Sequence, residues 1–177
     1  MDDKRIAWAI TGAGHMLEEC IQAALNFDRL DMFLSRAAEE VVRMYRLQER
    51  IAGPKLRIYE ETKASAPQVV RLFAGEYRVL VVAPATSNSV AKFVYGISDT
   101  LVTNLFAQAG KSRVPVIVYP TDLAAAMNSL GPNRQPVKVY PRPIDLENTA
   151  RLRAFPGVRV VGDRAELERC IAAALSR

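Results

Sequence analysis

Small and polar residues interrupt the sequence where a first buried strand should end. After the apolar run 5–10 the chain reads Thr11-Gly12-Ala13-Gly14-His15 and then enters a helical pattern. Backbone N–H groups of a glycine loop at a helix start can bind an anion, and the helix dipole strengthens that attraction. The loop therefore predicts an anion site that includes Gly12, Ala13, Gly14 and His15; a tight turn without a ligand is the alternative.

This loop differs from two common nucleotide motifs. A dinucleotide fingerprint needs a third glycine where the chain has Leu17, and an acidic residue after the second strand, where it has Ser35 and Arg36. No Gly-Lys-Ser/Thr sequence follows, which excludes a P-loop. The loop suits a monophosphate better than a pyrophosphate. Ser35 can add a hydroxyl donor to that site, and Arg36 can add a positive charge.

A second polar stretch follows the apolar run 79–82. Ala85, Thr86, Ser87 and Asn88 supply uncharged donors and acceptors, which suit the edge of a heteroaromatic ring and a polyol chain better than a metal. The alternative is that Ser87 or Asn88 caps the helix that runs through 90–95. Both interpretations can hold together, and the stretch is predicted to form the floor of a binding site.

Two residues are candidates for catalysis. His15, the only histidine, can donate to a phosphate, face a substrate, or simply begin a helix. Thr121 and Asp122 follow another buried strand, and Asp122 is the best-placed carboxylate for proton chemistry or for binding an amide-bearing ring. A solvated loop acid is the alternative for Asp122. No catalytic triad and no metal-ligand spacing can be assembled, so no metal site is predicted.

Apolar runs alternate with amphipathic segments along the chain, which predicts βαβ units and a parallel sheet. The fold class predicted is α/β: a three-layer Rossmann-like (flavodoxin-like) parallel sheet with helices on both faces, in one domain over residues 1–177. The predicted strands are 5–10, 30–34, 56–59, 79–82, 114–119, 137–140 and 158–161. The predicted helices are 16–25, 37–50, a segment starting at 65–67, 90–95, 99–109 ending at Gly110, 145–155, and a last one capped by Asp163. The irregular segment 121–136 is predicted to be either a lid or mobile.

Bulk properties narrow the function classes. Half of the 177 residues are hydrophobic and the formal charge is +5, spread along the chain without a basic block. No nucleic-acid partner is expected, because no recognition motif accompanies the charge. No apolar run reaches the roughly 20 residues that span a bilayer, and no signal peptide is recognisable, so we expect no membrane partner and a cytoplasmic location.

The chain resembles the homo-oligomeric FMN-containing flavoprotein superfamily, which includes cysteine-type decarboxylases and flavin prenyltransferases. The residues that carry this resemblance are Thr11–Gly14, Pro84–Asn88 with Ala91-Lys92, and Gly96–Leu101. The match is closer to archaeal-type flavoproteins and dihydromethanopterin reductase subunits. The residues that carry this closer match are Ile10–His15, Phe33–Ser35, Asp99–Asn104, and Pro143–Asp145 with Glu147-Asn148.

The resemblance implies an FMN across the carboxyl ends of the strands. Its phosphate would meet Gly12, Ala13, Gly14 and Ser35. Its ring and ribityl chain would meet residues 85–88, with Thr121 and Asp122 nearby. The superfamily builds trimers, often stacked into larger shells, with FMN at a subunit boundary. The helix 99–109 would supply much of the contact to a neighbouring subunit, and its surplus of apolar residues agrees with that.

The function predicted in this way is that of an FMN-dependent oxidoreductase. It would reduce dihydromethanopterin, or a related pterin, to the tetrahydro form with electrons from a separate donor: a reduced nicotinamide, free reduced flavin or a carrier protein. The alternatives are an FMN-dependent decarboxylase of a cysteine-type substrate and a flavin electron carrier. Against decarboxylation, the expected histidine between the second and fourth strands is missing, and Met127-Asn128 follows Ala125-Ala126 in place of a Pro-x-Met-Asn clamp.

Overall fold

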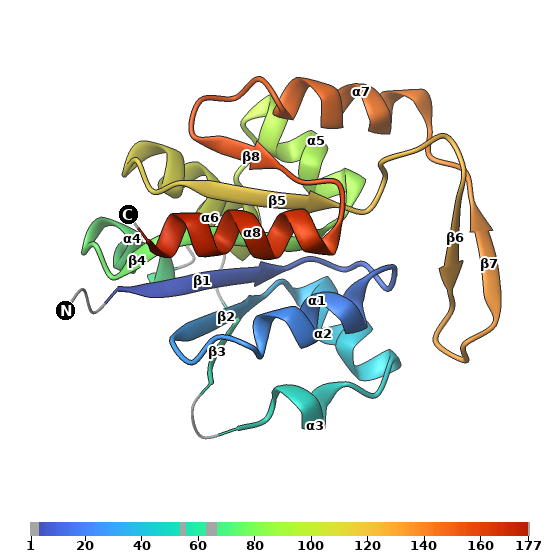
Figure 1. Ribbon diagram of the computed structural model, residues 1–177, viewed down its shortest axis with the longest axis horizontal. Coiled ribbons are helices and arrows are strands. Elements are labelled where there is room, and N and C mark those ends of the chain that lie inside the picture. The colour runs from blue at the N-terminus through green and yellow to red at the C-terminus, as the bar shows by residue number, and fades with distance from the viewer. Residues whose placement is uncertain (1–3, 54–55, 63–66, 177) are drawn as a thin grey trace.

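A six-stranded parallel sheet forms the centre of the molecule. The computed structural model describes residues 4–53, 56–62 and 67–176, and Figure 1 shows the strands pointing the same way. The spatial order is β3-β2-β1-β4-β5-β8, and every pairing is parallel. The strands are β1 (Arg5–Ile10), β2 (Leu30–Leu34), β3 (Arg57–Glu60), β4 (Tyr77–Ala85), β5 (Val116–Pro120) and β8 (Val158–Val160).

Helices cover both faces of this sheet, as predicted. One face packs against α1 (Leu17–Ala24), α2 (Arg36–Met44), α3 (Gln48–Ile51) and α8 (Arg164–Leu175). The other packs against α4 (Val70–Phe73), α5 (Ser87–Tyr95), α6 (Leu101–Lys111) and α7 (Pro143–Leu152), with a 3₁₀ turn (Pro67–Val69) before α4. Two apolar cores result, one on each side of the sheet, and the predicted three-layer fold is confirmed.

Strand β1 is apolar along its length because both of its faces are buried. Successive strand side chains point to opposite faces, so Ile6, Trp8 and Ile10 enter one core while Ala7 and Ala9 enter the other. The chain leaves β1 toward β2 and β3 and then returns to the other side of β1 as β4. The carboxyl ends of β1 and β4 therefore form the switch point where open α/β sheets bind ligands.

Two of the predicted helices were wrong in detail. The helix 37–50 is broken, because α2 ends at Met44, Arg46 adopts a left-handed φ of 57°, and α3 starts anew at Gln48. Helix α6 does not end at Gly110 but runs through it to Lys111. The predicted helix start at 65–66 lies outside the described residues, whereas Asp163 caps α8 as expected by accepting from Glu166 N.

The segment 121–136 contains a strand that periodicity did not reveal. Strand β6 (Met127–Leu130) pairs antiparallel with β7 (Pro136–Val139), and their hairpin lies beyond the carboxyl ends of the main sheet (Figure 1). The strand predicted at 137–140 is β7, but β6 was not predicted because it is only four residues long, and its two apolar residues, Met127 and Leu130, do not alternate with polar ones. A turn containing Gly131 and Pro132 joins the two strands.

The apolar surplus of α6 has an explanation within the chain. Leu101, Val102, Leu105 and Phe106 are all buried in the core between α6 and the sheet. Phe106 also stacks on Phe93 of α5, with ring centroids 4.1 Å apart. These side chains pack inside the subunit, so their number does not support the prediction that α6 contacts a neighbouring subunit.

Candidate functional site

One threonine joins the two loops at the switch point. Thr11 Oγ1 donates to Pro84 O at 2.9 Å and accepts from Thr86 N at 2.8 Å. Thr11 itself is 2 % exposed. Because both hydrogen bonds are buried or nearly so, they hold the end of β1 and the start of α5 at a set separation.

The glycine loop is closely packed against α2 and the residue after it. A Cβ on Gly12 would lie 2.5 Å from the Cβ of Ala37, and one on Gly14 would overlap the hydroxyl of Tyr45. The Tyr45 hydroxyl in turn donates to Leu130 O of the hairpin at 3.0 Å. Glycine at these two positions lets the loop pass close to its neighbours, so its shape is set by its surroundings.

Two adjoining cavities open at this carboxyl edge. The first, about 600 Å³, is lined by Gly12, Ser35, Arg36, Ala37, Glu40, Glu61, Thr86, Asn88, Ser89, Lys92, Asp99 and Thr100. The second, about 410 Å³, is lined by Ala13, Gly14, His15, Thr86, Ser87, Asn88, Thr121, Asp122, Met127, Val139, Arg142 and Asp145. Thr86 and Asn88 belong to both. Every predicted site residue except Ala85 lines one of them; Ala85 is fully buried in β4.

The cap of α5 is Thr86, not Ser87 or Asn88. Thr86 Oγ1 accepts from Ser89 N at 3.3 Å, which places the cap one residue earlier than expected. Ser87 and Asn88 are consequently released from capping. The Ser87 hydroxyl oxygen is buried and has no hydrogen-bond partner in the described part of the chain.

In the first cavity, Ser35 is both a cap and a donor. It is buried, and its Oγ accepts from Ala38 N at 3.1 Å at the start of α2, which leaves the hydroxyl hydrogen for another acceptor. Lys92 donates to both carboxylate oxygens of Asp99 at 2.8 Å, and this hydrogen bond lowers the pKa of Asp99. Thr100, rather than Asp99, caps α6. The charge of Lys92 is thus partly balanced, and Arg36 is the exposed cation of this cavity.

The second cavity contains an ionic group that the sequence reasoning missed. Asp145 caps the start of α7 by accepting from the backbone N of Arg142 at 2.9 Å, and Arg142 Nη2 donates to Asp145 Oδ1 at 2.8 Å. The fragment Arg142-Pro143-Ile144-Asp145 carries a signal for this, because proline at the first helical position and an acid two residues later mark a helix start. Met127 and Val139 of the hairpin add apolar lining.

Asp122 is the carboxyl group of this cavity that has no hydrogen-bond partner among the described residues. It is half-buried, and burial is the main cause that raises its pKa, with the charge of Asp145 next. The positive charges of His15 and Arg142 act in the opposite direction. By contrast, the hydrogen bonds from Arg142 lower the pKa of Asp145. Two carboxyl groups with pKa values pushed apart are a common arrangement for acid–base work.

The hairpin is attached to the glycine loop. His15 Nδ1 lies 3.1 Å from Ser129 Oγ of β6, in addition to the Tyr45 contact with Leu130. Arg134 in the hairpin turn also lies 3.6 Å from Glu18 of α1. The hairpin therefore forms one wall of the second cavity and spans from Asp122 to α1.

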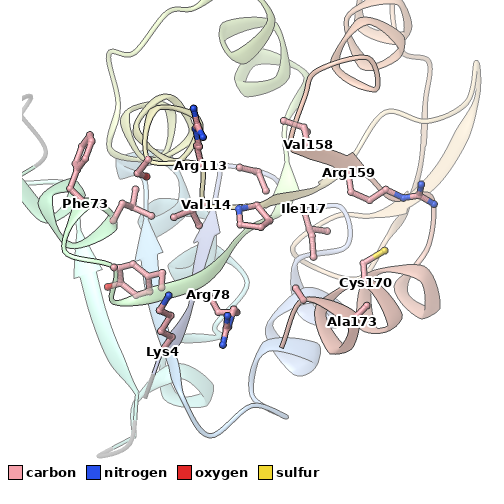
Figure 2. A pocket seen from close by; sticks show the side chains of 18 residues that line it. Lys4, Phe73, Arg78, Arg113, Val114, Ile117, Val158, Arg159, Cys170 and Ala173 are labelled. Atoms are coloured by element: carbon pink, nitrogen blue, oxygen red, sulfur yellow. The ribbon is translucent and has the colours of Figure 1, made fainter. Parts of the chain in front are cut away.

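A larger cavity, of about 720 Å³, lies at the opposite edge of the sheet. Figure 2 shows apolar side chains such as Val114, Ile117 and Val158 in its middle, with arginine side chains around them. It contains none of the predicted site residues. Within the described residues, no helix is long and apolar enough to cross a membrane, and no group of three or more His, Cys, Asp or Glu side chains could hold a metal.

These features define a doubly wound α/β protein whose ligand cavities lie at the topological switch point, next to a glycine loop. The chain belongs to the Flavoprotein family, whose model matches residues 1–175. Membership of this family agrees with the resemblance found in the sequence. It also agrees with the strand order and the position of the cavities.

Several relatives share most of the chain. An uncharacterized protein of Methanocaldococcus jannaschii is 37 % identical over 94 % of each chain. A dihydromethanopterin reductase (acceptor) of Methanosarcina mazei is 43 % identical over 73 % of this chain and 59 % of its own length. The chain therefore spans little more than half of that reductase.

Solved structures agree with this grouping. DmrB of Burkholderia xenovorans, a cubic protein cage for redox transfer solved in complex with FMN, is 40 % identical. The match covers 99 % of this chain and 97 % of DmrB, with a TM-score of 0.87. The cysteine decarboxylase TvaF from thioviridamide biosynthesis has the same fold at 21 % identity, covering 98 % of this chain and 99 % of its own, with a TM-score of 0.67.

Proposed function

We propose that this chain is an FMN-dependent reductase that converts a dihydropterin, dihydromethanopterin or a close relative, to its tetrahydro form. The observation that carries this proposal is the pair of adjoining cavities at the switch point, one with a hydroxyl and backbone donors and one with a protonatable carboxyl group. The reductases and DmrB among its relatives support the same function.

The residues of the first cavity fit the phosphate end of FMN. Gly12 lets the loop pack directly against Ala37 of α2, and the buried Ser35 beside it has a hydroxyl hydrogen to donate. Such a site binds a monophosphate through N–H and O–H donors, while Arg36 offsets part of the negative charge of Glu40 and Glu61 in the same cavity.

The boundary between the cavities fits the rest of the cofactor. The buried Ser87 hydroxyl lacks a partner, and a ligand oxygen or nitrogen placed beside it would satisfy it. Asn88 offers an amide donor and a carbonyl acceptor next to it. We therefore assign Ser87 and Asn88, with Thr86, to the ribityl chain and ring edge. Ala85, which lines neither cavity, would act through its backbone.

Bound FMN would supply the two electrons, as a hydride, that reduction of the pterin C=N bond needs. The protein must supply the accompanying proton to nitrogen. Asp122 is the group for this task, because its raised pKa keeps it protonated to a higher pH than an ordinary aspartate. His15, held against Ser129, orients the glycine loop and the hairpin around the site.

The electrons must come from a donor outside this chain. We propose a reduced nicotinamide, free reduced flavin or a carrier protein as that donor, a cytoplasmic location, and an oligomer built from trimers. The likeness to the cubic cage of DmrB supports assembly of many copies.

The test begins with the cofactor. The purified chain should bind about one FMN per subunit, measured by quenching of flavin fluorescence. After anaerobic reduction, addition of dihydromethanopterin should reoxidise the flavin and yield one tetrahydropterin per flavin. A protein that stays colourless after incubation with FMN would refute the proposal, and so would release of carbon dioxide from a cysteine-type substrate without pterin turnover.

A further inference from the structure

The second cavity holds an ion pair, Arg142 with Asp145, and a separate acid, Asp122. Asp145 is 6 % exposed and accepts three hydrogen bonds, all from Arg142: from the backbone N at 2.9 Å, Nε at 3.0 Å and Nη2 at 2.8 Å. Asp122 lines the same cavity and makes no hydrogen bond or ion pair within the described part of the chain. Arg142 and Asp145 are therefore bound to each other, whereas the carboxyl group of Asp122 is available to a ligand.

We infer that Arg142 and Asp145 are positioning residues that act on the proton of Asp122 from opposite directions. This inference rests on the proposed function, because it assigns the proton transfer to Asp122. The Asp145 carboxylate favours the protonated form of Asp122 and the Arg142 guanidinium favours its carboxylate, so the pair together sets the pH at which Asp122 gives up its proton. The substrate class that fits is a planar heterocycle with a C=N bond whose nitrogen accepts a proton.

The charges around Asp122 support this division of work. The positive groups that act on it are His15, from the loop before α1, and Arg142, from α7; the negative group is Asp145, also from α7. The remaining residues that line the cavity are uncharged: Ala13, Gly14, Thr86, Ser87, Asn88, Thr121, Met127 and Val139. The hairpin and α5 therefore contribute no charge that opposes the pair.

The proton and electron balance of the step is simple. The O–H bond of Asp122 breaks and an N–H bond forms on the substrate, while a hydride, which reduced FMN would supply, adds to the adjacent carbon. Two electrons and two hydrogens are thus added to the C=N bond, and Asp122 is left as a carboxylate. Since Asp122 is only half-buried, a proton from solvent restores it.

The two halves of the pair should shift the titration of Asp122 in opposite directions. Asp145→Asn removes the negative charge, so the pKa of Asp122 should fall by about one unit. Arg142→Gln removes the positive charge and leaves Asp145 unpaired, so the pKa of Asp122 should rise by about one unit. Both variants break the Arg142–Asp145 ion pair at the start of α7, so a merely structural role would not produce opposite signs.

The measurement is a carboxyl ¹³C NMR titration of the chain without FMN, with Asp122→Asn to assign the signal. Arg142→Lys, which keeps the charge, should restore most of the wild-type titration. Arg151→Gln, which removes the same charge about 13 Å further along α7, is the matched control and should leave it unchanged. Shifts of the same sign in Asp145→Asn and Arg142→Gln, or no shift in either, would overturn the inference.

The pH profile of pterin turnover gives a second test. An acid must be protonated to donate, so the rate should fall as pH rises through the pKa of Asp122. That fall should move to lower pH in Asp145→Asn and to higher pH in Arg142→Gln. If the NMR shifts appear but no pterin is reduced, the proposed function fails and the coupling stands. If pterin is reduced and the profiles do not move, the inference alone fails.

Discussion

The two edges of the sheet carry cavities of opposite character. At the amino edge lies the larger one, about 720 Å³, with apolar residues from β5 and β8 in its middle (Figure 2). At the carboxyl edge two smaller cavities are lined by a glycine loop, hydroxyls, an amide and side chains of both charges, whereas the charged side chains of the amino-edge cavity are all basic. The proposed reactive site is therefore chosen by the chemistry of the lining residues and not by cavity size.

The difference follows from how parallel strands are connected. Loops after the carboxyl ends lead into helix N-termini, whose free N–H groups favour polar and anionic ligands. At the amino edge, helix α6 ends and a loop returns to β5. The polar interactions there join parts of the chain to one another: buried Asp31 accepts from Arg5 at 2.6 Å and from the Tyr77 hydroxyl at 2.8 Å. We therefore expect the amino edge to stabilise the fold and the carboxyl edge to bind the ligand.

The largest effect is expected from the proton donor. Asp122→Asn should lower pterin turnover about 1000-fold, because a general acid contributes 10²–10⁴-fold, while FMN affinity changes little. Turnover and flavin quenching measure the two properties separately. The control at the other edge is Cys170→Ser, which should keep full turnover. Equal losses in both variants would show that the comparison between the edges is wrong.

Removal of the buried acid at the amino edge should affect stability only. Asp31→Ala leaves Arg5 and the Tyr77 hydroxyl without their partner, which should cost about 3 kcal/mol of unfolding free energy. Urea unfolding measures this cost. At temperatures where the variant is folded, its affinity for FMN should equal that of the wild type. A large loss of FMN affinity in the folded variant would contradict the separation of roles.

The glycine loop should tolerate no side chain at position 12. Gly12→Ala places a Cβ against Ala37 of α2, and the resulting shift of the loop should weaken FMN binding about 100-fold, or roughly 2.7 kcal/mol. Gly110→Ala is the matched control, since its Cβ would meet nothing within 4 Å and alanine favours a helix. Fluorescence titration compares the two. Unchanged affinity in Gly12→Ala would remove the loop from the site.

The smallest effect is expected at the hairpin. Ser129→Ala removes the hydroxyl 3.1 Å from His15 Nδ1, a contact worth about 1 kcal/mol. The Michaelis constant for pterin should therefore rise about fivefold, while the Tyr45 contact still holds the hairpin. Ser176→Ala, at the far end of α8, serves as the control. A changed FMN affinity without a changed Michaelis constant would assign the hairpin to cofactor binding instead.

The sequence predicted the fold and most of the site because both depend on local patterns. Short apolar runs such as residues 6–10, bounded by turn residues, are typical of buried strands, and their carboxyl ends in a parallel sheet share an edge. The sequence alone was therefore enough to predict that Gly12, Ser35 and Asp122 lie at the same edge of the sheet.

What the sequence did not predict depends on contacts between distant segments. Arg142 and Asp145 enter the second cavity only because α7 packs on α5. Strand β6 forms because β7 pairs with it, and α6 buries its apolar surplus because Phe93 and the sheet are there to receive it. No periodicity within one segment carries that information.

The bridge made by Thr11 has a consequence for the entropy of binding. Because one hydroxyl fastens the end of β1 to the start of α5, the two loops that hold the opposite ends of a ligand lose their independent motion during folding. A ligand that spans them then meets a ready-made frame and has less loop motion left to freeze. Thr11→Val would transfer that ordering cost to the binding step, so its signature would be a less favourable binding entropy with little change in the contacts made.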